Sequence, residues 1–146
     1  MQRSSTHPDD FLASLPEAVR ADMITLDAVL ASAFAGDERS LWEGTFWGGT
    51  EQRIIGYGAY RHVGRSGASG DWFVVGLAAQ KNYLSLYANA VEDGEYIGKR
   101  YAVRLGTVKA GSANLRFRRA SDVDLDVLRE LATRARELTT AGTSAG

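Results

Sequence analysis

The stretch DWFVVGLAAQKNYLSLYA, residues 71–88, decides the fold. Two apolar runs, Trp72–Ala79 and Tyr83–Ala88, flank the short polar break Gln80-Lys81-Asn82, a pattern typical of a β-hairpin. The first run is apolar on both of its faces, which favours a central place in a sheet. The second run alternates apolar residues with tyrosine and serine, so we expect one face in the core and the other turned away from it.

Three further strands are predicted around this hairpin. Leu41–Trp47 and Arg53–His62 precede it and alternate loosely on either side of a Gly-Gly-Thr turn. Ala113–Arg118 follows it and alternates cleanly. Gly56 and Gly58 share one face of the second strand, and glycines at such positions indicate a bend or a close approach by another element.

Helical segments lie before, between and after the strands. Pro8–Ser14 and Pro16–Phe34 are predicted helices, because each opens on a proline and the second places its apolar residues at a helical period. Glu92–Leu105 carries helix formers and predicts a third helix. The last helix begins after a cap at Asp122 or Asp124 and ends near residue 138. The Gly- and Ser-rich segment 64–70 predicts a flexible loop.

The elements follow the order α-α-β-β-β-β-α-β-α, which predicts an α+β two-layer sandwich. In this fold a mainly antiparallel sheet of about five strands carries the N- and C-terminal helices on one face. We expect a single domain over residues 8–138, with a disordered N-terminus at 1–7 and a disordered tail at 139–146.

The composition excludes several classes of protein. The 146 residues carry a formal net charge of −1, so the chain has no long-range attraction for nucleic acid or an anionic membrane. The chain has no cysteine, which removes disulfides and thiolate metal ligands. No apolar run is long enough to span a bilayer, and residues 1–6 lack the apolar core of a signal peptide. We therefore expect a cytoplasmic protein that binds neither nucleic acid nor membrane.

The order of several short motifs resembles the YdhG-like family, also called the DUF1801 domain, over residues 11–137. The motifs are Leu15-Pro16, Trp47-Gly48-Gly49-Thr50, Lys81 with Leu86-Tyr87, Lys109-Ala110-Gly111 and Leu115-Arg116-Phe117. At the second motif the chain departs from the family pattern, since Trp47 replaces a tyrosine and Thr50 a proline. The resemblance implies a frataxin-like fold, and because some members are labelled iron chaperones, it also implies iron as a candidate ligand.

The sheet face that points away from the helices is the candidate binding surface. If Trp42, Phe46, Leu84, Leu86, Leu115 and Phe117 point into the core, alternation sends an aromatic, hydroxylated and basic set to the other face. This set comprises Glu43, Thr45, Trp47, Tyr83, Ser85, Tyr87, Asn114, Arg116 and Arg118. Its composition suits a partner protein or a small anionic ligand. The predicted site residues are Glu43, Trp47, Lys81, Tyr83, Tyr87 and Arg116.

Other interpretations of these residues stay open or are weighed against the surface. The aromatic side chains of the face equally suit a solvated sheet or a homodimer interface, so the chain is expected to be a monomer or a homodimer. Lys109-Ala110-Gly111-Ser112 lacks the Walker pattern and does not lead directly into a helix, which argues against a phosphate loop. Lys81 in the hairpin turn is either a ligand contact or a solvated lysine.

Metal binding and catalysis have little support in the residues. The only histidines are His7 and His62, and no nucleophile is paired with a base in the sequence pattern. The carboxylates near the N-terminus do not keep to one helical ridge; they are Asp9, Asp10, Glu17, Asp22 and Asp27. We therefore predict a non-enzymatic binding domain with no metal site and no cofactor. A frataxin-like intracellular iron chaperone is the alternative that the family resemblance implies.

Overall fold

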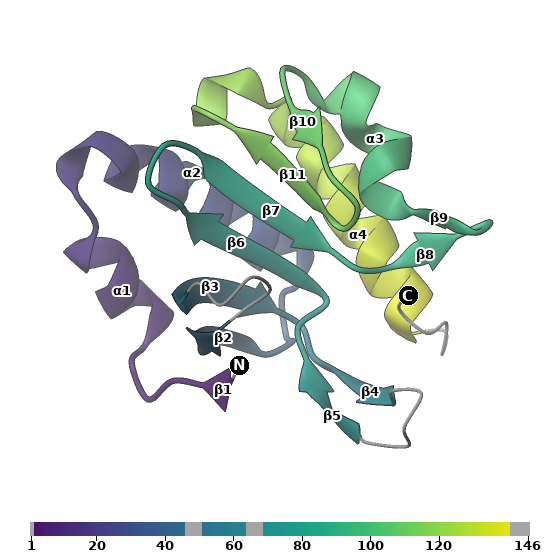
Figure 1. Ribbon diagram of the computed structural model, residues 1–146, viewed down its shortest axis with the longest axis horizontal. Coiled ribbons are helices and arrows are strands. Elements are labelled where there is room, and N and C mark those ends of the chain that lie inside the picture. The colour runs from purple at the N-terminus through teal and green to yellow at the C-terminus, as the bar shows by residue number, and fades with distance from the viewer. Residues whose placement is uncertain (1, 46–50, 64–68, 141–146) are drawn as a thin grey trace.

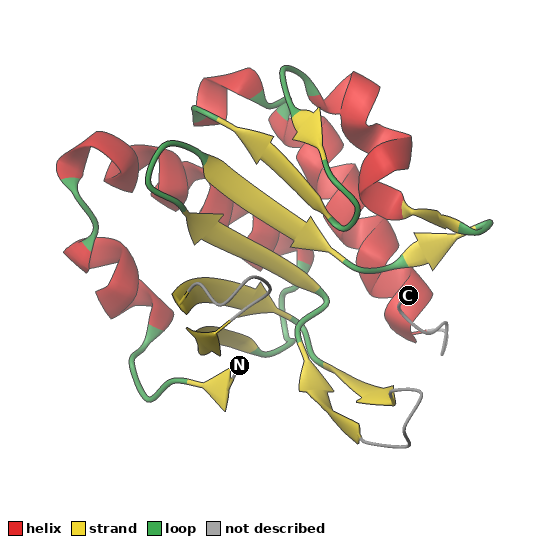
Figure 2. Cartoon of the chain, viewed as in Figure 1, coloured by secondary structure: helices red, strands yellow, loops and turns green. Residues whose placement is uncertain are grey.

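The structure is a computed structural model that describes residues 2–45, 51–63 and 69–140. Its fold is α+β, as predicted, and its seven-stranded sheet has more strands than the sequence predicted. Neighbouring strands in this sheet are antiparallel throughout. Helices cover one face of the sheet, as Figures 1 and 2 show.

The sheet strands are β1 (Gln2–Arg3), β2 (Arg39–Thr45), β3 (Glu51–Tyr57), β6 (Val75–Ala79), β7 (Leu84–Ala88), β10 (Lys109–Ala110) and β11 (Asn114–Phe117). Their order across the sheet is β1-β2-β3-β6-β7-β11-β10, so the predicted hairpin, β6–β7, is central. Two ribbons stand apart from the sheet: β4 (Tyr60–Val63) with β5 (Ser69–Trp72), and β8 (Val91–Glu92) with β9 (Glu95–Tyr96). The β4–β5 ribbon projects from the end of β3 and β6 (Figure 1).

The helices are α1 (Pro8–Ser14), α2 (Glu17–Ala33), α3 (Ile97–Leu105) and α4 (Leu125–Thr140). His7 caps α1, since its Nδ1 accepts a hydrogen bond from the backbone N–H of Asp9. Of the two predicted caps for the last helix, Asp124 is the one used: its Oδ1 accepts from the backbone N–H of Asp126 at 2.9 Å. Among the described residues, no helix combines the length and apolar character needed to cross a bilayer.

The main core lies between the sheet and α2, α3 and α4. A row of buried aliphatic residues crosses five neighbouring strands, each residue paired with the next: Leu41, Ile55, Leu77, Leu86 and Leu115. Met23 and Leu30 on α2 and Leu131 on α4 are fully buried in the same cluster. Because burial of each such side chain contributes about 1.5–3 kcal/mol, this row is a major source of stability.

A buried polar contact joins α2 to the sheet. The Tyr57 hydroxyl donates a hydrogen bond to Asp27 Oδ1 at 2.6 Å. Arg39 donates to both oxygens of the same carboxylate, at 3.0 Å from Nε and 2.8 Å from Nη2. Burial raises the pKa of Tyr57 well above its ordinary value, so the phenol is a hydrogen-bond donor.

Several local predictions differ from the structure. The first strand of the predicted hairpin, Trp72–Ala79, is divided, since Trp72 ends β5 and β6 begins at Val75, and α4 continues to Thr140, past the predicted start of the tail at residue 139. The segment predicted as one helix from Glu92 to Leu105 begins as the β8–β9 hairpin, whose turn places Asp93 at φ 54° and Gly94 at φ 78°, and becomes helical only as α3. Similarly, the predicted strand Arg53–His62 is divided into β3 and β4 at Gly58, which has φ 71°. Near the N-terminus, where disorder was predicted, β1 pairs with β2. At the end of the predicted loop 64–70, residues 69 and 70 belong to β5, and residues 64–68 lie outside the described part.

Candidate functional site

The sheet face opposite the helices has a covered part and an open part. The covered part is a second apolar cluster, termed the outer cluster, made of Trp42, Ile54, Phe73, Ala78 and Tyr87. The rings of Trp42 and Phe73 lie directly over the backbone of the sheet: a Cβ added at Gly56 would lie 2.6 Å from Trp42 Nε1, and one at Gly76 would lie 2.6 Å from Phe73 Cε1. The predicted close approach at Gly56 is therefore confirmed.

Trp42 does not point into the main core, as the sequence analysis expected. Leu41 belongs to the buried row across the sheet, and alternation along β2 places Trp42 on the opposite face, where it is 2% exposed. The prediction was wrong because the outer cluster makes both faces of the sheet apolar here. Phe46 and Trp47, which the same argument placed, lie outside the described residues.

Glu43 lies on the helix side of the sheet, away from the predicted surface. It shares the orientation of Leu41 and forms an ion pair with Arg53, from Nε to Oε1 at 3.1 Å. The Arg53 guanidinium carbon in turn lies 4.8 Å from the centre of the Phe11 ring on α1. Glu43 therefore takes part in a contact between α1 and the sheet, and its assignment to the binding face is wrong.

Tyr87 is on the predicted face but is buried in the outer cluster, with 7% exposure. Burial also raises the pKa of its hydroxyl. Beside it, the Gln80 side-chain amide donates to Gln52 Oε1 at 2.7 Å. These contacts give Tyr87 a packing role and leave little of its surface for a ligand or partner.

The open part of the face holds a pocket of about 300 Å³ at the turn between β6 and β7. We term it the cationic pocket; its lining residues are Asn82, Tyr83, Lys109, Arg116, Phe117 and Arg118. Of the predicted site residues, Tyr83 and Arg116 come together here. Lys81 is exposed in the same turn, one residue before the lining begins.

Pairing between β10 and β11 concentrates positive charge in the cationic pocket. Lys109 is the direct partner of Arg116 across the antiparallel ladder, so their side chains share one face. Arg118, just beyond the end of β11, lines the same pocket. Like charges that face each other across a sheet are destabilising, so this arrangement opposes folding.

These cations have no acidic partner in the described part of the chain, whereas most arginines of the protein do. The residues that line the cationic pocket include no carboxylate. By contrast, the arginines paired with an acid are Arg3, Arg39, Arg53, Arg61, Arg100, Arg104, Arg119, Arg134 and Arg136. The pocket is thus a local excess of positive charge in a chain whose net charge is −1.

Two neighbours define the position of Arg116. Its guanidinium carbon lies 5.2 Å from the centre of the Tyr83 ring, a cation–π contact that holds the side chain along the pocket wall. On its other side Arg116 is the cross-strand partner of Ser85. The Ser85 hydroxyl is buried and makes no hydrogen bond with any part of the chain that the structure describes.

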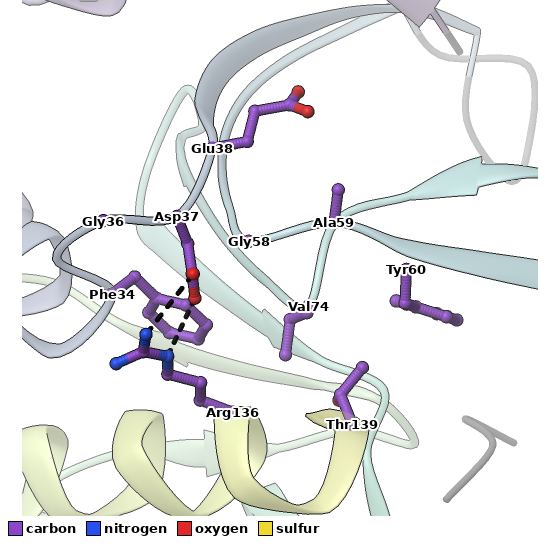
Figure 3. A pocket seen from close by; sticks show the side chains of 10 residues that line it. All are labelled: Phe34, Gly36, Asp37, Glu38, Gly58, Ala59, Tyr60, Val74, Arg136 and Thr139. Carbon is purple, nitrogen blue, oxygen red and sulfur yellow. Dashed lines mark hydrogen bonds and ion pairs between the residues drawn. The ribbon is translucent and has the colours of Figure 1, made fainter. Parts of the chain in front are cut away.

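A larger cavity, of about 540 Å³, lies where α2 and α4 meet the hinge between β3 and β4 (Figure 3). Figure 3 shows Asp37 and Arg136 facing each other at one side of it, with Tyr60 and Thr139 at the other. Arg136 Nε lies 2.8 Å from Asp37 Oδ2, and its Nη1 donates to the Ala33 carbonyl at 3.4 Å. The charged groups of this cavity are paired within the protein. It therefore presents fewer unpaired charges to a charged ligand than the cationic pocket does.

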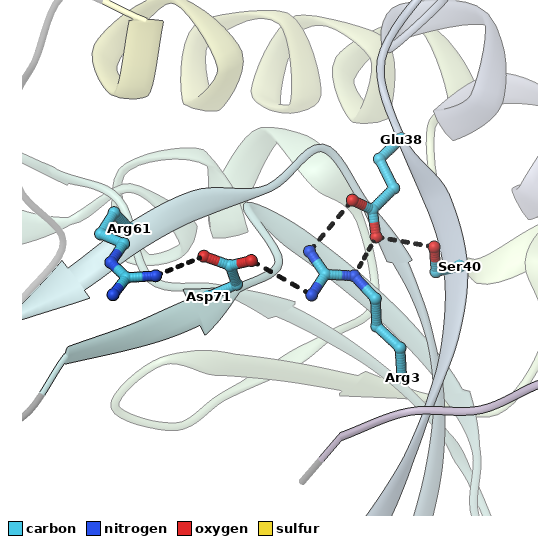
Figure 4. A network of polar contacts seen from close by, with 5 residues as sticks. All are labelled: Arg3, Glu38, Ser40, Arg61 and Asp71. Carbon is cyan, nitrogen blue, oxygen red and sulfur yellow. Dashed lines mark hydrogen bonds and ion pairs between the residues drawn. The ribbon is translucent and has the colours of Figure 1, made fainter.

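A network of ion pairs holds β1 and the β4–β5 ribbon together (Figure 4). Arg3 donates to Glu38 and, at 3.2 Å, to Asp71, which also lies 3.5 Å from Arg61 Nη1. The hydrogen bond from Arg3 is the main cause that lowers the pKa of Glu38. The Ser40 hydroxyl donates to the same carboxylate at 2.7 Å. Each acid of this network is satisfied, so we assign it a structural role.

The carboxylates considered for iron are also engaged by arginines or dispersed. Arg39 binds both Asp9 and Asp27, and Arg119 binds Asp22. In residues 2–45, 51–63 and 69–140, no three histidine or carboxylate side chains come together as a metal-binding group. The iron-chaperone alternative therefore rests on the family resemblance and has no site in the described residues.

No family model, curated protein or solved structure matches this chain. The lining residues of the cationic pocket that the sequence analysis did not include in the candidate site are Asn82, Lys109, Phe117 and Arg118. Arg118 was placed on the correct face but left out of the site. As a candidate for binding, Lys109 was considered only as part of a possible phosphate loop. The signal that points to its side chain is the pair of basic residues, Lys109 and Arg116, on either side of the Gly111-Ser112 turn.

Proposed function

We propose that the protein is a non-enzymatic binding domain that takes a small anionic ligand in the cationic pocket on the open part of its sheet. One observation carries this proposal: three cations line the pocket and none has an acidic partner among the described residues. An anion bound there would relieve the repulsion between Lys109 and Arg116 and would gain charge-assisted hydrogen bonds.

Burial favours a small ligand over a protein partner. Aromatic side chains anchor protein interfaces. Of the aromatics that the sequence assigned to this face, Tyr87 is 7% exposed and Tyr83 is half-buried beside the pocket, while Trp47 lies outside the described residues. The pocket is at the lower end of the volumes typical of ligand sites, about 300–1,000 Å³. It therefore suits a small molecule better than a protein surface.

The residues of the pocket favour binding over catalysis. Its lining contains no carboxylate, histidine or cysteine. Lysine and arginine side chains carry N–H donors and no acceptor, and the tyrosine hydroxyl can donate as well. The groups present act as hydrogen-bond donors to an anion.

The family and the location belong to the same proposal. Membership of the YdhG-like family is supported by the order of motifs from Leu15-Pro16 to Leu115-Arg116-Phe117. A cytoplasmic location is supported by the absence of cysteine from the sequence. A monomer suffices for the pocket, since all six lining residues come from one chain.

Isothermal titration calorimetry with two simple anions, benzoate and phenyl phosphate, tests the proposal. At low ionic strength we expect at least one of them to bind, and Arg116→Gln to weaken that binding roughly tenfold, because one charge-assisted hydrogen-bonding group is lost. Arg129→Gln is the matched control: Arg129 is exposed on α4, donates to the Ser32 hydroxyl and lies outside the pocket. Absence of heat with both anions, or equal weakening by the two variants, would contradict the proposal.

A further inference from the structure

The charge and geometry of the cationic pocket identify a class of ligand. We infer that the pocket binds the dianionic phosphoryl group of a small phosphomonoester in preference to a carboxylate or a singly charged anion. This inference rests on the proposed function, since it specifies the ligand of the same pocket.

The number of cations is the first argument. Lys109, Arg116 and Arg118 bring three positive charges to a pocket without a carboxylate. A carboxylate or a sulfate ester brings one negative charge and leaves most of this excess uncompensated. A phosphomonoester brings about −1.5 to −2 at pH 7 and three acceptor oxygens, so it balances most of the charge and provides an oxygen for each cation.

The kinds of donor are the second argument. Two arginines and one lysine converge here, and arginine presents a planar fork of N–H groups that matches phosphate oxygens in pairs, while lysine supplies a compact point charge. Arg116 lies opposite Lys109 across the β10–β11 ladder, and Arg118 lines the same pocket. The three donors therefore surround one volume and are not spread along the surface.

The third argument is that Arg116 is held in place before any ligand arrives. Its guanidinium stacks on Tyr83 at 5.2 Å, and the turn that carries Tyr83 is closed by the Gln80 backbone N–H, which donates to the Tyr83 carbonyl at 2.8 Å. A fixed donor loses less conformational entropy on binding than a free arginine side chain. Tyr83 is thus a positioning residue, which acts through Arg116.

Matched ligands test the charge preference directly. Phenyl phosphate and phenyl sulfate have nearly the same shape but differ in charge, and benzoate adds a carboxylate. By calorimetry at pH 8 and low ionic strength, we expect phenyl phosphate to bind at least about tenfold more tightly than either of the others. Arg116→Gln and Lys109→Gln should reduce this ratio, whereas Lys99→Gln, an exposed lysine on α3 outside the pocket, should leave it unchanged.

The outcomes separate this inference from the proposed function. Binding of all three anions with similar affinity, each weakened by Arg116→Gln, would overturn the phosphomonoester preference and leave an anion-binding pocket. Binding of none of them would overturn both. Tighter binding of phenyl phosphate that survives Arg116→Gln and Lys109→Gln would also overturn the inference, because the preference would then arise elsewhere in the protein.

Variants at Tyr83 test its positioning role. Tyr83→Phe keeps the ring and should retain the affinity for phenyl phosphate within about twofold, whereas Tyr83→Leu removes the ring and should weaken it by roughly threefold to tenfold. In the double variant with Arg116→Gln, the change Tyr83→Leu should have no further effect on affinity. Equal losses for the Leu change with and without Arg116 would show that Tyr83 acts independently of it.

Discussion

Replacement of Gly56 by alanine should destabilise the protein, because the outer cluster leaves no space for a methyl group. The new Cβ would lie 2.6 Å from Trp42 Nε1 and 2.7 Å from Phe73 Cβ. Phe73 Cβ is fixed to the main chain, so rotation of a side chain cannot remove that second contact. Overpacking of this kind costs about 1–3 kcal/mol, and the lower entropy of the unfolded alanine chain offsets about 0.4–1 kcal/mol of it. We expect a net loss of about 1–2 kcal/mol in the free energy of unfolding.

Urea unfolding followed by tryptophan fluorescence measures this loss, and near-UV circular dichroism reports whether the packing of the aromatic side chains has changed. Gly70→Ala is the matched control, since a Cβ at Gly70 on β5 has nothing within 4 Å. It should leave stability unchanged or raise it by up to about 1 kcal/mol. If Gly56→Ala were as stable as Gly70→Ala, the close packing of Trp42 and Phe73 on the sheet would be refuted.

Three further predictions concern the ion pairs. Asp27→Asn should lower the free energy of unfolding by about 2–4 kcal/mol in urea titrations, because it removes the buried carboxylate charge that Arg39 and Tyr57 share and leaves Arg39 with the exposed Asp9 as its acidic partner. The hydrogen bond from Arg119 lowers the pKa of Asp22, so this pair stabilises the fold fully above the ordinary aspartate pKa and loses its effect as the pH falls through the lower folded value. Stability should therefore fall as the pH drops below about 5, and less steeply in Asp22→Asn. Arg3→Gln should cost less than about 1 kcal/mol globally but speed amide hydrogen exchange in β1, since its acids are partly exposed.

The sequence predicted the centre of the fold well, where one periodicity dominates. The β6–β7 hairpin has a clear polar turn, and Leu84 and Leu86 alternate with side chains of different character, so both pairing and orientation follow. On β2 the same rule failed, because Leu41 and Trp42 are both apolar and both buried. Alternation specifies orientation only where the two faces differ in polarity.

The β8–β9 hairpin was not predicted, because the residues around its turn favour a helix. Its two central residues, Asp93 and Gly94, both have positive φ, and Asp-Gly is the residue pair that such a turn favours. That dipeptide was the available signal. The helix-forming residues that follow it outweighed this signal. Each strand of the ribbon has only two residues, too few to show a period of their own.

The sequence predicted only part of the candidate site, because alternation can be recognised in its longer strands and not in its shortest one. Tyr83 and Arg116 were found because Tyr83 adjoins β7 and Arg116 lies within β11, and both strands have a regular alternation. Lys109 was missed because β10 has two residues, too few for a period to appear. Its orientation depends on pairing with β11, which the Gly111 backbone N–H supports by donating to the Asn114 carbonyl at 2.8 Å.

The most direct test of the central claim is an NMR titration of the ¹⁵N-labelled protein with phenyl phosphate. The account predicts saturable shifts of the backbone amides that line the cationic pocket, those of Asn82, Tyr83, Lys109, Arg116 and Arg118, with the amides of the larger cavity, such as Gly36 and Thr139, unmoved. Shifts confined to the larger cavity, or no saturable shift at all, would contradict it.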